Sequence, residues 1–224
     1  MTDARNQEPE SVSGKAGYHH GGLREALIAA AFQLVVEKGA ENFSLADACR
    51  LAGVSTAAPY RHFRDREELM AEVMARAFDA MSANNMRAVQ AHGEGTLEAI
   101  VAMGQAYLRF AITQQSLFRL MFGQDPSLAE DETCVEKGRS CFGNLIAQIR
   151  KYCDANGIEE DANAIALKMW TFVHGASALL IDRKYELIAP GVDIDEMIAT
   201  TVPLLLAQPG QHTDKIGPRS VASN

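Results

Sequence analysis

Apolar residues recur every three or four positions along most of the chain, which is the spacing of one face of an α-helix. The clearest early stripe holds Leu23, Leu27, Leu34 and Val35, and Gly39 follows it as a plausible helix stop. No segment alternates apolar and polar positions with β-branched residues, as a half-buried strand does. The pattern therefore predicts an all-α fold.

Capping residues and glycines divide the remaining pattern into separate helices. Ser44 is placed to cap a short helix, and Ser55, after the turn residue Gly53, is placed to cap a third helix that runs to residue 63. Asp65, with Glu68 three residues later, resembles a capping box and opens a fourth helix to about residue 91. Further helices are predicted over residues 97–111, 116–122, 127–155, 161–187 and 193–207, with Pro203 bending or ending the last one.

The two ends of the chain lack this apolar pattern. Residues 1–17 are polar, and residues 208–224 are rich in proline and glycine, so neither segment can bury enough surface to offset the entropy lost on ordering. We therefore expect a disordered arm at 1–17 and a disordered tail at 208–224. Between them we expect a small domain of three helices at 18–64 and a larger helical domain at 65–207.

Composition places the chain among globular proteins, with 224 residues of which 47% are hydrophobic. No uninterrupted apolar run approaches the ~18 residues that a membrane span needs, and the N-terminus has no apolar core of a secretory signal. The four cysteines show no C-x-x-C pair, which favours reduced, buried thiols, with oxidation sensing by Cys134 and Cys141 as the alternative. We expect a cytoplasmic protein with no membrane association.

The charge is unevenly distributed along the chain. The net charge of -8 argues against a protein that coats nucleic acid indiscriminately. Residues 1–66 hold 8 Lys+Arg against 8 Asp+Glu, whereas residues 67–224 hold 13 against 21. This asymmetry permits a DNA-facing front domain on an acidic body.

The stretch SLADACRLAGVSTAAPYRHF, from Ser44 to Phe63, joins two predicted helices through Ala52-Gly53-Val54. This spacing is typical of a helix-turn-helix, whose second helix can lie in the major groove of DNA, and also of a tight helical hairpin in a bundle. Small residues on the second segment would let base edges approach, and the polar rings and arginines beyond them would meet phosphates. The candidate DNA contacts are Ser44, Ser55, Thr56, Ala57, Ala58, Tyr60, Arg61, His62, Arg64 and Arg66.

Residues 18–69 resemble the DNA-binding domain of the TetR family of transcriptional regulators. The matching elements are YHHGGLREAL, the Ser44 cap, AGVS, YRHF, and Arg66 with Leu69 at the start of the next helix. The resemblance implies that Thr56, Ala57 and Ala58 face bases, that Ser44, Tyr60, His62 and Arg66 contact phosphates, and that Val54 and Phe63 pack the domain. Arg66 stands where the family usually has lysine. The resemblance also implies a ligand-responsive regulator acting on an operator. Our leading hypothesis is a repressor, and the sequence leaves activation open as the alternative.

Residues before the first helix carry polar rings of their own. Tyr18, His19 and His20 suit a flexible arm that reaches the DNA backbone or minor groove, and Arg24 adds a further candidate phosphate contact. A metal site at the adjacent imidazoles is the alternative, but neighbouring residues rarely converge on one ion without further ligands. We therefore predict no metal.

The segment 161–187 predicts an interface between two copies of the chain. It is apolar on nearly all sides, so it must be covered on nearly all sides, either by the chain's own core or by a partner. Small residues from His174 to Ala178 would admit close approach of a second helix, and Ile194, Met197, Ile198 and Leu205 could join them in a symmetric four-helix interface. A homodimer would present two copies of the DNA-binding domain to a palindromic operator of double-stranded DNA.

The spacing Trp170-x-x-x-His174-Gly175 resembles a signature of the C-terminal domain in a subset of TetR-like regulators. Aromatic and methionine side chains of the central helices are either ordinary core or the lining of a pocket for a small, mostly apolar effector. The candidate lining residues are Met103, Tyr107, Phe110, Phe118, Met121, Phe122, Phe142, Trp170 and His174.

No Gly-rich phosphate loop, nucleophile elbow or metal-spaced cluster is apparent, so we predict no enzyme, no catalytic residues and no cofactor. Two alternatives to the regulator stay open. One is an all-α small-molecule-binding or dimerisation protein without specific DNA binding, and the other is a helical enzyme that uses His174.

Overall fold

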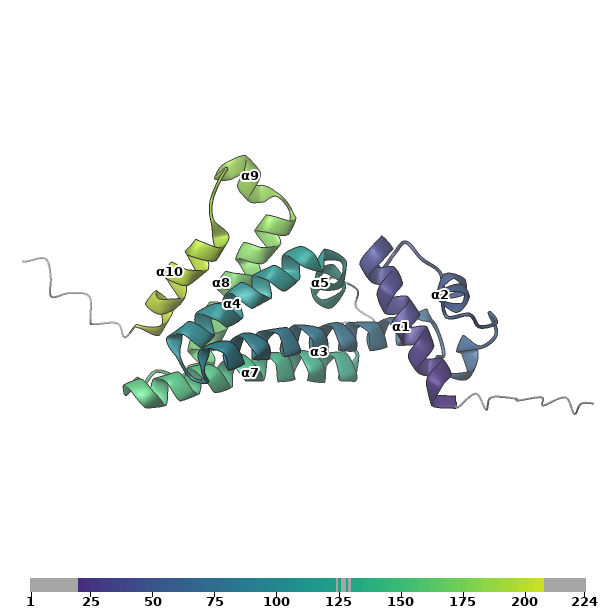
Figure 1. Cartoon of the computed structure of the whole chain (residues 1–224), viewed down its shortest axis with the longest axis horizontal. Coiled ribbons are helices and arrows are strands. Elements are labelled where there is room, and N and C mark those ends of the chain that lie inside the picture. Colours follow the sequence, from purple (N-terminus) through teal and green to yellow (C-terminus); the bar gives the residue numbers. More distant parts are fainter. Residues whose placement is uncertain (1–19, 124, 126–127, 129, 208–224) are drawn as a thin grey trace, which may run out of the picture.

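The structure is a computed structural model that describes residues 20–123, 125, 128 and 130–207 (Figure 1). These residues form helices, turns and loops and contain no strand, which confirms the all-α prediction. The arm at 1–17 and the tail at 208–224, both predicted to be disordered, lie outside the described residues. So do Tyr18 and His19, whereas His20 is the first residue of a helix.

The end of the first helix and the start of the second fall where their capping residues predict. Helix α1 spans His20–Lys38, and Gly39 follows it with a φ of 87°, a left-handed conformation that glycine adopts at little cost. Helix α2 spans Leu45–Leu51. Ser44 caps α2 through a reciprocal pair of hydrogen bonds with Asp47, in which the Ser44 Oγ accepts from the Asp47 N–H at 3.2 Å and the Ser44 N–H donates to the carboxylate at 2.9 Å.

The third helix, predicted from Ser55 to residue 63, is wrong in type and extent. Residues 56–58 form turns, and only η1, a short 3₁₀ helix, follows at Pro59–Arg61. Proline explains the change, because in an α-helix the Ser55 carbonyl would accept from the nitrogen of Pro59, which carries no hydrogen. The Ser55 carbonyl instead accepts from the Ala58 N–H at 3.0 Å, a bond of 3₁₀ spacing.

Helix α3 is the long connection between the two parts of the chain and spans Arg66–His92. Asp65 caps it by accepting from the Glu68 N–H at 2.8 Å. The capping box is incomplete, since the Glu68 carboxylate accepts from the Arg64 N–H at 2.7 Å in place of the Asp65 N–H. Glu68 therefore bonds the backbone one residue before the N-cap, at Arg64 and not at Asp65.

The larger body contains helices α4, α5 and α7 to α10. Helices α4 and α5 lie close to their predicted ranges, at Leu97–Thr113 and Gln115–Phe122. Helix α7, at Glu132–Asn156, starts later than the predicted residue 127 because Asp131 is its N-cap. Helix α10, at Ile194–Leu206, contains Pro203 without ending there; the proline removes one donor and the helix continues for three residues.

The single helix predicted over residues 161–187 is two helices. Helix α8 spans Ala162–Ile181 and helix α9 spans Lys184–Ile188. Between them Arg183 adopts a left-handed φ of 56°, which interrupts the ladder of backbone hydrogen bonds. The Arg183 guanidinium bonds Glu186 in the first turn of α9, so the break is held by a local ion pair.

Helix α3 runs through the molecule, with α1, α2 and η1 at one end and the remaining helices along the rest of its length (Figure 1). One apolar core continues from the small domain into the body, and Leu27, Leu69 and Ile165 are all fully buried in it. Helix α8 is long and apolar enough to span a membrane by length and composition, with 39% of that stretch buried in the fold. It packs on α4, α7 and α10, as the core helix of a globular body does.

Candidate DNA-binding edge and ligand cavity

Residues Ser55 to Arg61 form an edge of the small domain, which we call the exposed edge. Ser55, Thr56, Ala57 and Arg61 are exposed, Ala58 is half-buried, and the Tyr60 side chain is 68% exposed. Two buried side chains anchor this segment, Pro59 within it and Phe63 just beyond it. The segment therefore presents small and polar side chains outward on a fixed support, even though most of it is not helical.

Some polar groups near the exposed edge are free and others are engaged. Among the described residues, the side chains of Tyr60, Arg61 and His62 have no hydrogen bond or ion pair. The Arg64 guanidinium donates to the Glu68 carboxylate at 3.1 Å. This bond raises the pKa of Arg64, and the pKa of Glu68 is lowered mainly by the backbone N–H of Arg64.

Two arginines that were predicted to reach phosphates bind groups of the protein itself. The Arg66 guanidinium donates to the Ala40 carbonyl and lies 5.3 Å from the ring centre of Phe43. The Arg24 guanidinium pairs with Glu72 and lies 5.4 Å from the ring centre of Phe63. Both side chains thus pack the domain, and their contact with DNA stays a prediction.

Ser44 also has a structural task beside its predicted phosphate contact. Its hydroxyl and N–H both bond Asp47, and these bonds lower the pKa of Asp47 to about 2. The ionised Asp47 also accepts from Arg50 at 2.8 Å. The start of α2, which would lie against a DNA backbone, is therefore fixed by its own side chains.

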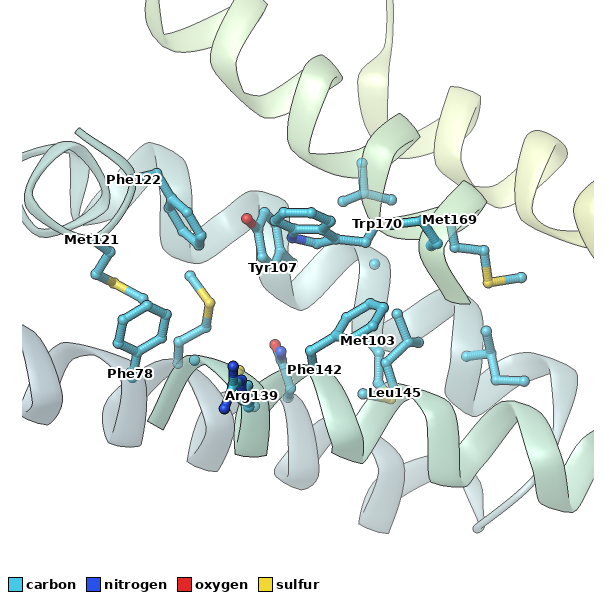
Figure 2. A pocket seen from close by; sticks show the side chains of 18 of the residues that line it. Phe78, Met103, Tyr107, Met121, Phe122, Arg139, Phe142, Leu145, Met169 and Trp170 are labelled. Atoms are coloured by element: carbon cyan, nitrogen blue, oxygen red, sulfur yellow. The ribbon is translucent and has the colours of Figure 1, made fainter. Parts of the chain in front are cut away.

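A cavity of about 430 Å³ lies in the larger body between α3, α4, α5, α7, α8 and α10 (Figure 2). In Figure 2 the rings of Phe122, Tyr107, Trp170 and Phe142 come from four different helices toward the same space. The predicted lining residues that do line it are Met103, Tyr107, Met121, Phe122, Phe142 and Trp170. Phe110, Phe118 and His174 do not line it.

His174 lies behind the cavity wall in a cluster of rings. Its Nδ1 is 2.8 Å from the Tyr107 hydroxyl, and its imidazole stacks on Phe118 with ring centres 5.3 Å apart. The Phe122 and Trp170 rings lie at 4.8 Å and 5.4 Å from it. Burial lowers the pKa of His174 and raises that of Tyr107, so both groups are held neutral.

Several lining residues were missed by the sequence analysis, among them Phe78, Asn85 and Arg139. Asn85 lies in a polar stretch, which concealed it. Its spacing was a usable signal, since Met81 precedes it and Val89 follows it at four-residue intervals and both are buried. A polar side chain on such a stripe must enter the interior.

The cavity also contains two thiols. Burial raises the pKa of Cys134 to about 12 and that of Cys141 to about 11. The Cys134 Sγ donates to the Ala71 carbonyl at 3.3 Å. Neutral thiols are poor nucleophiles, which favours the structural role over oxidation sensing.

Helix α5 touches both parts of the molecule. Its residues Met121 and Phe122 line the cavity, and the helix also packs on α1 of the small domain. Phe122 contacts Phe78 of α3 as well, with ring centres 5.9 Å apart. A change in the cavity can therefore reach α1 through one short helix.

The outer sides of α8 and α10 are only partly covered. Leu179 is 44% exposed and Leu204 is 60% exposed, and a Cβ added to Gly175 would meet no atom within 4 Å. The predicted interface residues Ile194 and Ile198 are instead buried in the chain's own core. That part of the predicted interface is wrong, because these residues lie on the inner side of α10.

The architecture is thus that of a small helix-turn-helix domain joined to a larger helical body with a cavity. Comparison with known proteins gives the family. Residues 27–73 match the family described as bacterial regulatory proteins of the tetR family, and residues 100–205 match the tetracyclin repressor-like C-terminal domain. Together the two matches cover more than half of the chain, and the chain belongs to the TetR family of transcriptional regulators.

Individual relatives agree with this assignment. An uncharacterized HTH-type transcriptional regulator of Haemophilus influenzae is 31% identical over 108 residues, which are 48% of this chain and 52% of the relative. The match thus spans about half the length of that curated relative. A protein of unknown function from Rhodococcus sp. RHA1 is 29% identical with a TM-score of 0.72, covering 86% of this chain and 97% of that one. The structure of RolR in complex with resorcinol has a TM-score of 0.58 at 17% identity, covering 82% and 86%.

Proposed function

We propose that the protein is a homodimeric regulator that binds a palindromic operator through the exposed edge and leaves it when a small, mostly apolar effector fills the cavity. The exposed edge is the observation that carries this proposal. Thr56 and Ala57 are small enough to let base edges approach, and Tyr60 and Arg61 carry free donors beside them. With few hydrogen-bonding groups among the small residues, contact with thymine methyls and DNA shape supply much of the specificity.

The remaining DNA contacts in the proposal differ in strength of support. Tyr60, Arg61 and His62 have no competing partner among the described side chains. Arg64 can exchange its exposed partner Glu68 for a phosphate at little cost, since ion pairs on the surface contribute little to stability. Arg66 would have to leave the Ala40 carbonyl, so we propose that it supports the domain first.

The dimer follows from the uncovered sides of α8 and α10. Gly175 leaves open space for a second helix, and Leu179 and Leu204 would be covered by it. Leu187 and Ile188 of α9, each 80% exposed, extend the apolar surface between α8 and α10. A symmetric pair would set two exposed edges about one turn of DNA apart.

The effector site in the proposal is the cavity. Its volume lies in the range of small-molecule sites, about 300–1,000 Å³. RolR, which shares the fold, binds resorcinol, an aromatic ring with polar substituents. The rings around this cavity suit an apolar body of that general kind.

Coupling between the cavity and DNA runs through α5 in this proposal. An effector beside Met121 and Phe122 shifts α5 against α1 and favours a dimer whose edges no longer match the half-site spacing. DNA and effector then oppose each other reciprocally. The domain limits proposed are residues 18–64 for DNA binding and 65–207 for effector binding and dimerisation.

The Trp170, His174 and Gly175 spacing gains a physical role in this scheme. Trp170 lines the cavity, His174 holds the Tyr107 hydroxyl behind the wall, and Gly175 faces outward. One helix thus contributes to the cavity, its support and the dimer face. In this scheme His174 supports the cavity wall, since its one side-chain hydrogen bond within the described chain is to Tyr107.

The test is selection of bound duplexes from a random DNA pool by the full-length protein, with the mass of the complex measured in parallel. We expect an inverted repeat bound by two chains. A folded dimer that binds ligand and enriches no sequence would contradict the proposal and support the small-molecule-binding protein. We also propose that the protein acts in the cytoplasm and without membrane association, because that is where its DNA target would lie.

A further inference from the structure

One buried polar atom in the cavity lacks a partner. The Asn85 side chain is only 6% exposed and lines the cavity, and its amide oxygen Oδ1 has no hydrogen-bond partner among the described residues. An unpaired buried acceptor is costly, because it has lost its hydrogen bonds to water and gained none in the protein. Such an atom in an otherwise apolar pocket marks a place where a ligand can donate a hydrogen bond.

A second polar group borders the same cavity from the neighbouring helix. Arg139 of α7 lines the cavity, and within the described chain its guanidinium has no ion pair or hydrogen bond. The nearest turn of α7 differs in this respect, since Lys137 pairs with Asp79 at 2.9 Å. Arg139 lies between Phe78 and Phe142 in Figure 2, beside the rings that form the cavity.

Two other polar groups of the cavity already have partners. The Tyr107 hydroxyl is held by His174 at 2.8 Å. The Cys134 thiol donates to a backbone carbonyl. Asn85 and Arg139 therefore stand out as an acceptor and a cation without partners, on two adjacent helices.

We infer that the effector is an apolar organic acid that also carries a hydroxyl or N–H donor. The donor bonds the Asn85 Oδ1, the acid group pairs with Arg139, and the apolar body packs between Phe78, Phe142 and Trp170. This inference rests on the proposed function only in giving the ligand a regulatory role. The binding of the ligand depends on the cavity alone.

The test uses four compounds built on one naphthalene ring system. They are a hydroxynaphthoic acid, its methyl ether, its neutral amide, and naphthalene, with identical ring positions in the substituted three. Affinity for the full-length protein is measured by calorimetry without DNA. We expect the hydroxy acid to bind about tenfold more tightly than the methyl ether, which cannot donate to Asn85. We expect it to bind about three- to tenfold more tightly than the amide, which lacks the charge for Arg139.

Two variants assign each preference to its residue. Asn85→Leu should remove the advantage of the hydroxyl over the ether and keep the advantage of acid over amide. Arg139→Gln should do the reverse. Arg150→Gln is the matched control, because Arg150 is an exposed arginine of the same helix that does not line the cavity; both preferences should survive it.

Folding is checked separately, because Asn85 is buried. Asn85→Leu should raise the melting temperature of the ligand-free protein, since it removes an unpaired polar atom. Arg139→Gln, at an exposed position, keeps the test valid if Asn85→Leu does not fold. Equal affinities for all four compounds in the wild type, or preferences that survive both cavity variants, would overturn the inference.

Failure here is distinguishable from failure of the proposed function. Selection of an inverted repeat together with indifferent compounds defeats the ligand chemistry and leaves the regulator intact. The expected preferences in a protein that enriches no DNA sequence leave the ligand chemistry intact and defeat the regulator.

Discussion

The exposed edge and the cavity are built in opposite ways. The edge is continuous in sequence, from Ser55 to Arg61, and turns its polar groups outward with little α-helical structure. The cavity collects residues from six helices and is lined mainly by apolar groups, with Asn85 as a buried polar exception. Chemistry carried by neighbouring residues is visible in a sequence, whereas the full set of groups that distant helices bring together is seen only in the fold.

The largest effect on DNA binding should come from disrupting the dimer, which separates the two copies of the exposed edge and leaves the edge and the cavity unchanged. Gly175→Leu adds a side chain to the outer side of α8, where a Cβ meets no atom of the same chain within 4 Å. The monomer should fold and gain about 0.5–1 kcal/mol of helix propensity. Because the partner helix can no longer approach, the variant should sediment as a monomer and lose about a hundredfold or more of its operator affinity.

Gly143→Leu is the matched control for this experiment. Gly143 lies inside α7, and an added Cβ there also meets nothing within 4 Å. The control should stay dimeric and bind DNA normally. A dimeric Gly175→Leu variant would show that the interface lies elsewhere.

Two arginines of the small domain should separate DNA contact from support. Arg66→Ala removes the bond to the Ala40 carbonyl and the contact over Phe43, so it should lower the free energy of unfolding by about 1–3 kcal/mol. Arg61→Ala should leave stability within about 0.5 kcal/mol and weaken binding to all DNA. It should reduce the salt slope by about 2, because the dimer loses one phosphate contact from each chain. Chemical denaturation and titrations at several salt concentrations check both.

The two arginine variants would contradict the division of roles if their effects were exchanged. A stable Arg66→Ala protein with weakened DNA binding would return Arg66 to the phosphate contacts. Thr56→Ala is the companion variant, and it should alter the preference among duplexes rather than the affinity for all of them.

The smallest effect concerns pH and the ring cluster behind the cavity. Burial lowers the pKa of His174 in the folded protein below the unfolded value of about 6.5. As pH falls through the window between these two values, the unfolded chain takes up the proton first, so the free energy of unfolding should decrease. Above the unfolded value the contribution of His174 is fully present and should not vary.

His174→Gln should remove this component from a pH series of denaturation curves. The quantity to compare is the slope of the free energy of unfolding against pH, between the unfolded pKa of His174 and its lower folded pKa. An unchanged slope in the variant would show that another group accounts for it.

Much of the fold followed from local signals in the sequence. Ser44, Asp65 and Asp161 cap helices as their types predict, and Gly39 ends α1 in a left-handed conformation. The third helix failed because proline denies the Ser55 carbonyl its α-helical donor. Arg183 divided the predicted helix at 161–187 through one backbone angle, which composition does not reveal.

The sites were predictable to different depths. The aromatic lining of the cavity, including Tyr107, Phe142 and Trp170, could be predicted because large apolar side chains on central helices converge. Phe118 and His174 pack against each other behind the cavity wall. The sequence pattern does not distinguish such residues from those that line the cavity. Arg139 could not be predicted as a ligand contact. It is a candidate because its guanidinium borders the cavity without an ion pair to any described residue, and only the folded structure shows this.

The central claim is that two copies of the exposed edge read two half-sites on one face of DNA. The most direct test inserts about five base pairs, half a helical turn, between the half-sites of the selected operator. We expect affinity to fall to the level of unrelated duplexes, because the second edge then faces away from its half-site. Undiminished affinity for the interrupted operator would contradict it.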